Sequence, residues 1–243
     1  MQFVKLDDNP KFIDVINKIH SEPWPRFLNE SAIIKKYWRK LYKIFPQYQF
    51  LLKDNSEYIG LANTFPIYWN GEIVNLPTGF DESIETILQE PEAANTLCAL
   101  AIVIKKKFSG KGLSSLILKY VKEAGKTYGF TDLIIPVRPT LKSKYPLIPM
   151  KNYMLWERSG LPFDPWLRVH VKNGGIILKE AYPSMVVRGS VAEWQEWTGL
   201  YFGDNGEYII EGALNPVRID LKNDFGEYIE PNVWVLHKTS TND

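Results

Sequence analysis

Hydrophobic residues recur at two spacings along the chain, and these spacings predict helices and strands in alternation. Residues 10–20 and 31–45 carry apolar side chains three and four positions apart, as amphipathic helices do. Residues 49–53 and 57–68 are apolar runs joined by a short polar turn, which predicts a β-hairpin. A further short helix is expected at 81–89.

One segment, 96–121, joins an apolar run to an amphipathic helix through a glycine-containing turn. Leu97 to Ile104 is typical of a buried strand, and apolar residues recur at helical spacing from Leu113 to Val121. Gly110-Lys111-Gly112 lies between them. A helix that begins after such a turn leaves backbone N–H groups unpaired, and its dipole favours negative charge. The segment therefore predicts an anion site, whose usual occupant is a phosphate.

Two familiar nucleotide motifs do not fit this turn. The Walker pattern GxxxxGK followed by Ser or Thr is absent, and the fingerprint GxGxxG requires a glycine where Ser115 stands. The acidic residue that would bind a ribose near the end of the next strand, at 133–139, is also missing. A nucleotide-dependent enzyme is therefore disfavoured.

The turn resembles the pyrophosphate-binding motif of the GNAT superfamily of CoA-dependent N-acyltransferases, whose signature is Gln/Arg-x-x-Gly-x-Gly/Ala between a strand and a helix. Gly112 matches this signature, whereas Ser109 stands where Gln or Arg is usual and Ser114 where Gly or Ala is usual. Ser114 is still small, but Ser109 lacks a cationic or amide group. Lysines at 105–107 and 111 are expected to replace part of that positive potential.

The resemblance implies an α/β fold of the α+β type, with a central twisted, mixed sheet flanked by helices. It places the acyl-CoA unit at about 96–180, with a helix at 113–128, and it leaves a strand-rich C-terminal part at 181–238. Strands are expected there near Glu207–Ile210, Asn215–Leu221 and Val233–Leu236. No linker rich in Ser, Gly or Pro divides the chain, so a single domain over 1–243 is expected.

The resemblance also implies an activity, the transfer of an acyl group from acetyl-CoA or another acyl-CoA to an amine by direct attack on the thioester. The CoA-binding residues that it implies are Ile102, Val103, Ile104, Phe108, Ser109, Gly110, Lys111, Gly112, Leu113 and Ser114. A backbone N–H of Ile102 to Ile104 would polarise the thioester carbonyl. The alternative function is a non-catalytic acyl-CoA-binding or sensing protein of the same fold, which Ser109 and the absence of a carboxylate in 97–104 both favour.

The proton-transfer groups are harder to assign. Counting four residues back from Gly174, where the family usually has a Tyr acid, gives His170, a candidate general acid for the thiolate. The alternative is a buried, hydrogen-bonded histidine. The base stays unassigned, because each carboxylate considered is expected to be solvated or in a turn: Asp81, Glu90, Glu92, Asp220 and Glu230. The basic, proline-rich loop 138–149 either contacts the phosphates or an acidic acceptor, or is a rigid solvated loop.

Composition narrows the range of partners. Lys plus Arg total 29 and Asp plus Glu total 28 in 243 residues, and this near-neutrality argues against a dedicated nucleic-acid binder. A single cysteine, Cys98, rules out an internal disulfide, and the three histidines lack metal-ligand spacing, so no metal is expected. No signal-peptide plan or long apolar run is present, so a cytoplasmic protein without a membrane partner is expected. The amine acceptor and the oligomeric state stay open.

Overall fold

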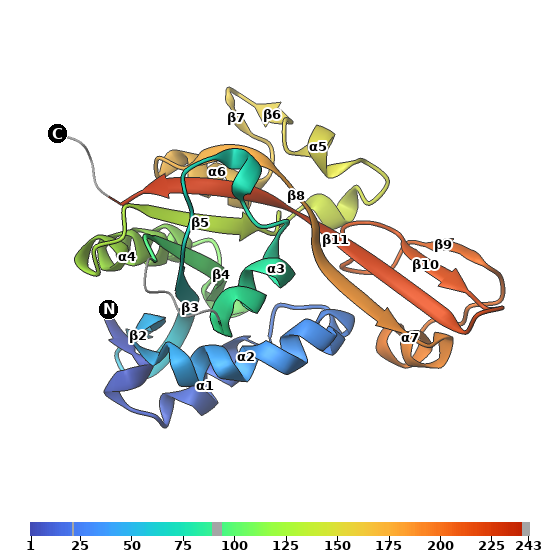
Figure 1. Ribbon diagram of the computed structural model, residues 1–243, viewed down its shortest axis with the longest axis horizontal. Helices are drawn as coiled ribbons and strands as arrows, with labels where there is room; N and C mark the ends of the chain where they lie inside the picture. Colours follow the sequence, from blue (N-terminus) through green and yellow to red (C-terminus); the bar gives the residue numbers. More distant parts are fainter. Residues whose placement is uncertain (21, 89–93, 240–243) are drawn as a thin grey trace.

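The computed structural model describes residues 1–20, 22–88 and 94–239 (Figure 1). The helices in these ranges are α1 (Phe12–His20), α2 (Ala32–Ile44), α3 (Phe80–Glu85), α4 (Leu113–Thr127), α5 (Met150–Tyr153), α6 (Pro165–Lys172) and α7 (Val191–Thr198). The strands are β1 (Gln2–Lys5), β2 (Gln49–Asp54), β3 (Glu57–Ile67), β4 (Thr96–Ile104), β5 (Asp132–Val137), β6 (Glu157–Arg158), β7 (Leu161–Pro162), β8 (Ile176–Gly189), β9 (Gly206–Tyr208), β10 (Val217–Asp220) and β11 (Phe225–Lys238).

A mixed central sheet organises the molecule, as the sequence predicts. Its strand order is β1-β2-β3-β4-β5-β11-β10-β9, and β8 pairs with β11 outside this path. The β4–β5 pair is parallel, and the other pairs of this sheet are antiparallel. A parallel pair needs a crossover connection, and α4 supplies it between β4 and β5.

Two hydrophobic cores lie on opposite faces of the sheet. The first core contains Ile16 of α1, Trp38 of α2 and Ile84 of α3, together with Cys98 of β4. The second core packs α4, α5 and α6 on the other face, and Leu97 of β4 belongs to it. Neighbouring strand residues therefore contribute to different cores, as the alternation of side chains in a strand requires.

A bulge interrupts this alternation in β4. Ala99 pairs with Thr64 and Ala101 pairs with Asn63, so Leu100 is an extra residue on β4. Leu100 and its neighbour Ala101 consequently both lie in the first core. The bulge shifts the register of the last residues of β4, which border the candidate site.

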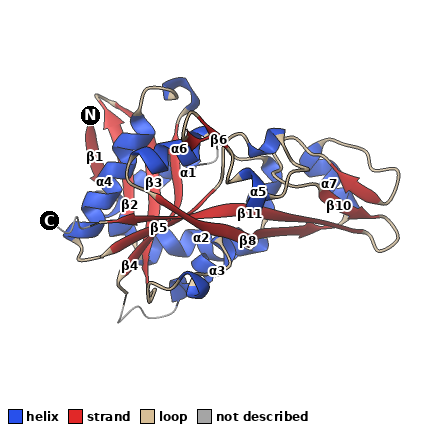
Figure 2. Cartoon of the chain, turned by 90° about the horizontal axis from the view of Figure 1, so that it is seen from above, coloured by secondary structure: helices blue, strands red, loops and turns tan. Residues whose placement is uncertain are grey.

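The two longest strands, β8 and β11, leave the central sheet together and form an extension with β9, β10 and α7 (Figures 1 and 2). The prediction of a strand-rich C-terminal part is confirmed, although Val233–Leu236 is only the end of a strand that begins at Phe225. Gly226 contributes to this continuity, because its missing side chain leaves room for the Trp194 indole of α7. The single-domain organisation stays a prediction.

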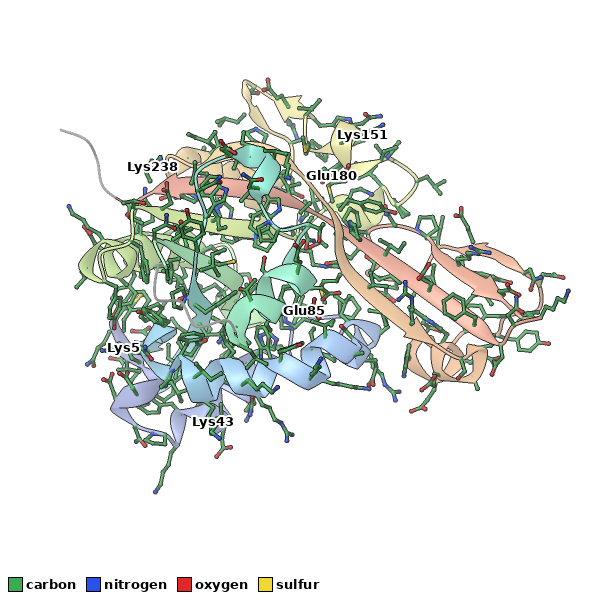
Figure 3. All side chains as sticks on the ribbon, in the orientation of Figure 1. Lys5, Lys43, Glu85, Lys151, Glu180 and Lys238 are labelled. Atoms are coloured by element: carbon green, nitrogen blue, oxygen red, sulfur yellow. The ribbon has the colours of Figure 1, made fainter. Side chains whose placement is uncertain are left out.

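Most predicted elements are present, with changed ends. The helix expected at 81–89 is α3 followed by a 3-10 turn, Thr86–Leu88, and Gln89 lies outside the described residues. Strand β1 was not predicted from the sequence. Lysines such as Lys43 and Lys151 point away from the ribbon into solvent (Figure 3), so the charges are spread over the surface. None of the described helices is long and apolar enough to cross a membrane.

Candidate active site

Strands β4 and β5 begin as neighbours and then separate. Their pairing covers only Thr96–Cys98 of β4 and Asp132–Ile134 of β5. Beyond this point β4 continues to Ile104 and β5 to Val137 without pairing with each other. A gap therefore opens in the middle of the sheet, with backbone groups along its edges.

Backbone groups of Ile102 and Ile104 face this gap. The Lys105 N–H donates to the Ile59 carbonyl at 3.0 Å, which fixes the antiparallel alternation between β3 and β4. In that alternation the pairs Ile102–Ala62 and Ile104–Gly60 exchange no hydrogen bonds. The N–H and C=O groups of both isoleucines consequently point away from β3, toward the side where β5 has diverged. They can bind an extended chain of amides that lies in the gap.

The turn after β4 has the geometry of an anion site. Gly110 and Gly112 adopt φ values of 78° and 75°, a left-handed conformation that glycine adopts readily. Gly112 precedes the first residue of α4, and no side chain caps that helix end. The first N–H groups of α4 therefore lack partners within the helix, and its dipole adds partial positive charge there.

The lysines near this turn carry less free charge than the sequence indicates. Lys105 and Lys107 both pair with Glu57, at Nζ–Oε1 distances of 3.1 and 2.7 Å. No ion pair involves Lys106 or Lys111 within the described part of the chain. The positive potential at the turn thus comes mainly from those two lysines and from the helix end.

A cavity of about 730 Å³ runs through the gap and connects the two faces of the sheet. On the α4–α6 face it is lined by the turn after β4 and by Trp166 and Val169. On the other face it is lined by His20, Trp24 and Phe80, which pack against the α1–α3 side. Ligands that enter from opposite faces can therefore meet where β4 and β5 part.

The cavity brings together most of the predicted CoA-binding residues. Those that line it are Ile102, Val103, Ile104, Ser109, Gly110, Gly112 and Ser114. Phe108, Lys111 and Leu113 are not among its lining residues. Leu113 is 6% exposed and belongs to the second core, and the Lys111 Nζ lies 5.3 Å from the centre of the Phe108 ring.

His170 lies apart from the cavity lining. It is fully buried between α6 and β11, where its Nδ1 is 2.9 Å from Nε2 of His237. The Trp166 ring, which does line the cavity, lies 4.2 Å from the His170 ring. Burial, followed by the neighbouring His237, keeps the pKa of His170 well below its usual value. This position matches the alternative of a buried, hydrogen-bonded histidine, and the acid role stays a prediction.

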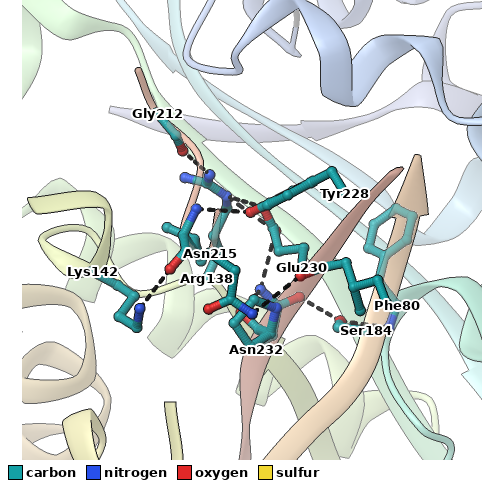
Figure 4. Close-up of polar contacts among 12 residues, drawn as sticks. Phe80, Arg138, Lys142, Ser184, Gly212, Asn215, Tyr228, Glu230 and Asn232 are labelled. Atoms are coloured by element: carbon teal, nitrogen blue, oxygen red, sulfur yellow. Dashed lines mark hydrogen bonds and ion pairs between the residues drawn. The ribbon is translucent and has the colours of Figure 1, made fainter. Parts of the chain in front are cut away.

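An ion pair that sequence reasoning missed lies in the cavity wall (Figure 4). Arg138 follows β5, and its Nε donates to both oxygens of Glu230, at 3.1 and 2.9 Å. Tyr228 and Asn232 also donate to the Glu230 carboxylate. Arg138 Nη2 donates to the carbonyl of Gly212. The guanidinium is thus held from two sides.

The expectation that Glu230 is solvated is wrong. Its residue is 0% exposed, and Arg138, Tyr228 and Asn232 surround its carboxylate. Asp81 is largely buried too, and burial raises its pKa to about 7. Its neighbour Phe80 lines the cavity, but Asp81 does not. Glu90 and Glu92 lie outside the described residues.

Two aromatic residues on the α1–α3 face carry buried polar ring atoms that have no hydrogen-bond partner among the described residues. His20 Nδ1 and Trp24 Nε1 are buried and have no hydrogen bond among the described residues. The His20 ring stacks on Trp38, with ring centroids 4.5 Å apart, which fixes its orientation. Burial lowers the pKa of His20 to about 4, so the ring is neutral at pH 7. Buried polar atoms without partners are rare, and both of these residues line the cavity.

The chain resembles known proteins in fold and in sequence. It matches the GNAT-like decarboxylase GphF in complex with isobutyryl-CoA with a TM-score of 0.66 and 16% identity, over 99% of this chain and 100% of that one. The loading GNATL domain of CurA from Lyngbya majuscula gives a TM-score of 0.59 and 18% identity, over 98% and 96%. The arginine N-acetyltransferase avaD of Aspergillus versicolor is 28% identical over 250 residues, 89% of this chain and 86% of that protein. The chain therefore has the fold of these GNAT-like proteins.

No family model matches the sequence. The turn departs from the usual GNAT signature at Ser109 and Ser114, and both residues nevertheless line the cavity. The described residues include no group of three or more His, Cys, Asp or Glu side chains arranged to hold a metal ion.

Proposed function

We propose that the protein is an N-acyltransferase that moves an acyl group from acyl-CoA to an amine. The observation that carries this proposal is that one cavity joins the start of α4 to the free edge of β4. A diphosphate fits the start of α4, because unpaired N–H groups and the helix dipole both favour an anion. The amides of a pantetheine arm fit the free edge of β4, where the backbone groups of Ile102 and Ile104 can bind them.

The reaction needs no covalent enzyme intermediate. The amine nitrogen attacks the thioester carbon from the α1–α3 face, the new C–N bond forms and the C–S bond breaks. A backbone N–H of the free β4 edge donates to the carbonyl oxygen, where negative charge develops in the transition state. The amine loses a proton and the departing thiolate gains one. For the second transfer we propose His170, whose ring contacts the Trp166 ring in the cavity lining.

The similarity to avaD indicates the first acceptor to test. That protein is an arginine N-acetyltransferase, and the two chains match over most of their lengths. We therefore infer that a small amine is acylated and that arginine belongs in the first panel.

Calorimetric titration with acetyl-CoA, with ATP and NAD as controls, tests the ligand class. We expect acetyl-CoA alone to bind, with an affinity in the micromolar range. Release of CoA thiol in the presence of amines then tests turnover. Cys98 is fully buried, so its thiol does not contribute to a thiol-release signal from the folded protein. Binding without turnover of any amine would favour the non-catalytic acyl-CoA sensor instead.

A further inference from the structure

We propose that the Arg138–Glu230 pair is an acceptor subsite that binds the carboxylate of an amino-acid substrate. This inference rests on the proposed function, because it names the acceptor class for the same cavity. The pair lies in the cavity wall together with Met185 and Asn232, away from the β4–α4 unit that would bind CoA. Both Met185 and Phe80 belong to the first core, which places this part of the wall on the α1–α3 face of the sheet. The amine acceptor would enter from this face, the acceptor face.

The hydrogen bonds of the pair decide which partner has capacity for a ligand. Each Glu230 oxygen already accepts two hydrogen bonds, from Arg138 Nε and from either Tyr228 or Asn232. The Glu230 side chain is only 1% exposed. A carboxylate saturated in this way offers little to a cationic group of the substrate.

Arg138 is the partner with unused donors. Its Nε and Nη2 bind Glu230 and Gly212, and the Tyr228 hydroxyl is a further partner, so these contacts use fewer than the five N–H groups of the guanidinium. Its side chain is 18% exposed although it is held on two sides. The Trp24 Nε1–H, on another wall of the same cavity, also lacks an acceptor. The unused groups on these residues are N–H donors, so the substrate must supply oxygen acceptors.

Glu230 then has a positioning role. It neutralises and orients the guanidinium, so Arg138 can lie in a largely apolar wall without a ligand. Ser184 extends the support, since its Oγ donates to Asn232 and accepts from the Phe80 N–H at 3.0 Å. The chain of contacts links β11 and β8 to α3, so the carboxylate subsite is fixed relative to the acceptor face (Figure 4).

Matched acceptors that differ by a carboxylate test this subsite. The pairs are arginine and agmatine, lysine and cadaverine, and phenylalanine and phenethylamine, and argininamide keeps the carbonyl without the charge. Both kcat/KM and the Kd for protein saturated with CoA are measured, so the result does not depend on turnover alone. We expect the acid of at least one pair to be preferred roughly 10- to 100-fold over its amine, as one charge-assisted hydrogen bond allows. Argininamide should behave like agmatine.

Variants of the pair make the test specific. Arg138→Gln should bring the acid-to-amine ratio close to one. If that variant unfolds because Glu230 is left unpaired, Arg138→Gln/Glu230→Gln removes the charge and should give the same ratio. Glu230→Gln alone should raise the ratio, because Arg138 is then no longer neutralised. Arg188→Gln is the matched control, since Arg188 of β8 forms an exposed pair with Glu227 of β11, the strand that also carries Glu230, and it should keep the wild-type ratio.

The two proposals fail in different ways. If acetyl-CoA does not bind or no amine is acylated, the proposed function is wrong and the subsite is wrong with it. If amines are acylated but each acid equals its decarboxylated partner, only the subsite is wrong. A ratio that survives in both Arg138 variants, or that falls in Glu230→Gln, would also overturn the assignment of the carboxylate to Arg138.

Discussion

A pair of substitutions at Gly112 separates the charge of the proposed diphosphate site from its shape. Gly112 has a φ of 75°, and no atom lies within 4 Å of the place where a Cβ would stand. Asn and Asp tolerate this left-handed conformation better than other non-glycine residues, at a cost of about 1 kcal/mol in stability. Their side chains have the same shape, and both can cap the first turn of α4. Gly112→Asp and Gly112→Asn therefore differ mainly by one negative charge.

The magnitude follows from Coulomb's law. A carboxylate ~5 Å from a phosphate charge, at an effective dielectric constant of about 20, opposes it by about 3 kcal/mol. Gly112 is exposed, and salt screens the interaction, so we expect about 1–3 kcal/mol. CoA should then bind Gly112→Asp roughly 10- to 100-fold more weakly than Gly112→Asn. The difference should shrink as the salt concentration rises.

Calorimetry with CoA, with both variants at low and high salt, measures this difference. Thermal unfolding of the two variants supplies the control, since their melting temperatures should nearly coincide. Equal CoA affinities for the Asp and Asn variants at low salt would refute the reasoning, because the carboxylate of the Gly112→Asp variant would repel a diphosphate bound at the start of α4.

Three further predictions concern the cores. His170→Phe should lower the melting temperature by removing the contact with His237 and should leave CoA affinity unchanged; a rate loss above tenfold at unchanged stability would instead support the general-acid role. Burial lowers the pKa of His237 to about 4, so the unfolded chain takes up a proton below pH 6.5 that the folded chain does not. His237 alone should then cost about 2 kcal/mol of stability by pH 5, and the lowered pKa values of His20 and His170 should increase the loss measured by urea unfolding. Gly79→Ala should cost about 1–3 kcal/mol, because its Cβ would lie 2.3 Å from the Ser184 Cα, whereas Gly206→Ala, with open space around it, should be neutral in the same assay.

The unit around β4 and α4 could be predicted from the sequence because its signals are local. An apolar run, a glycine turn and a helical repeat follow one another within residues 96–127, and each keeps its expected structure. The resemblance to the GNAT motif rests on the same short stretch. The positions of Ile102 and Ile104 at the gap also agree with the residues expected from that resemblance.

The Arg138–Glu230 pair could not be predicted in this way, because it depends on contacts between residues 92 positions apart. Glu230 stands two residues after Tyr228 and two before Asn232, and such polar positions usually mark the solvated face of a strand. Here Glu230 is buried instead, with Arg138, Tyr228 and Asn232 around its carboxylate. The signal in the sequence was the cluster of polar residues beside Pro231 within an otherwise apolar strand.

The count that led to His170 locates a residue beside the cavity, and the acid role of that residue stays a prediction. It fixes the distance in sequence from the end of α6, but not the direction in which the side chain points. Trp166 lines the cavity four residues before His170, and residues at this spacing lie on the same side of a helix, so their rings are 4.2 Å apart. A count along the sequence therefore could not show that the His170 ring would contact His237 of β11.

Residues of the two strands that border the gap, β4 and β5, explain why the pairing between them stops. The last shared pair is Cys98 with Ile134, and two residues further on each strand carries a feature that opposes continued pairing. On β4 this is the bulge at Leu100, and on β5 it is Pro136, which has no N–H. The Thr239 N–H donates to the Thr131 carbonyl at 3.2 Å, and the alternation from that bond directs the Pro136 nitrogen away from β11, toward β4. The missing donor thus lies on the side where the cavity opens, so β5 keeps its ladder with β11 while β4 keeps a free edge for a ligand.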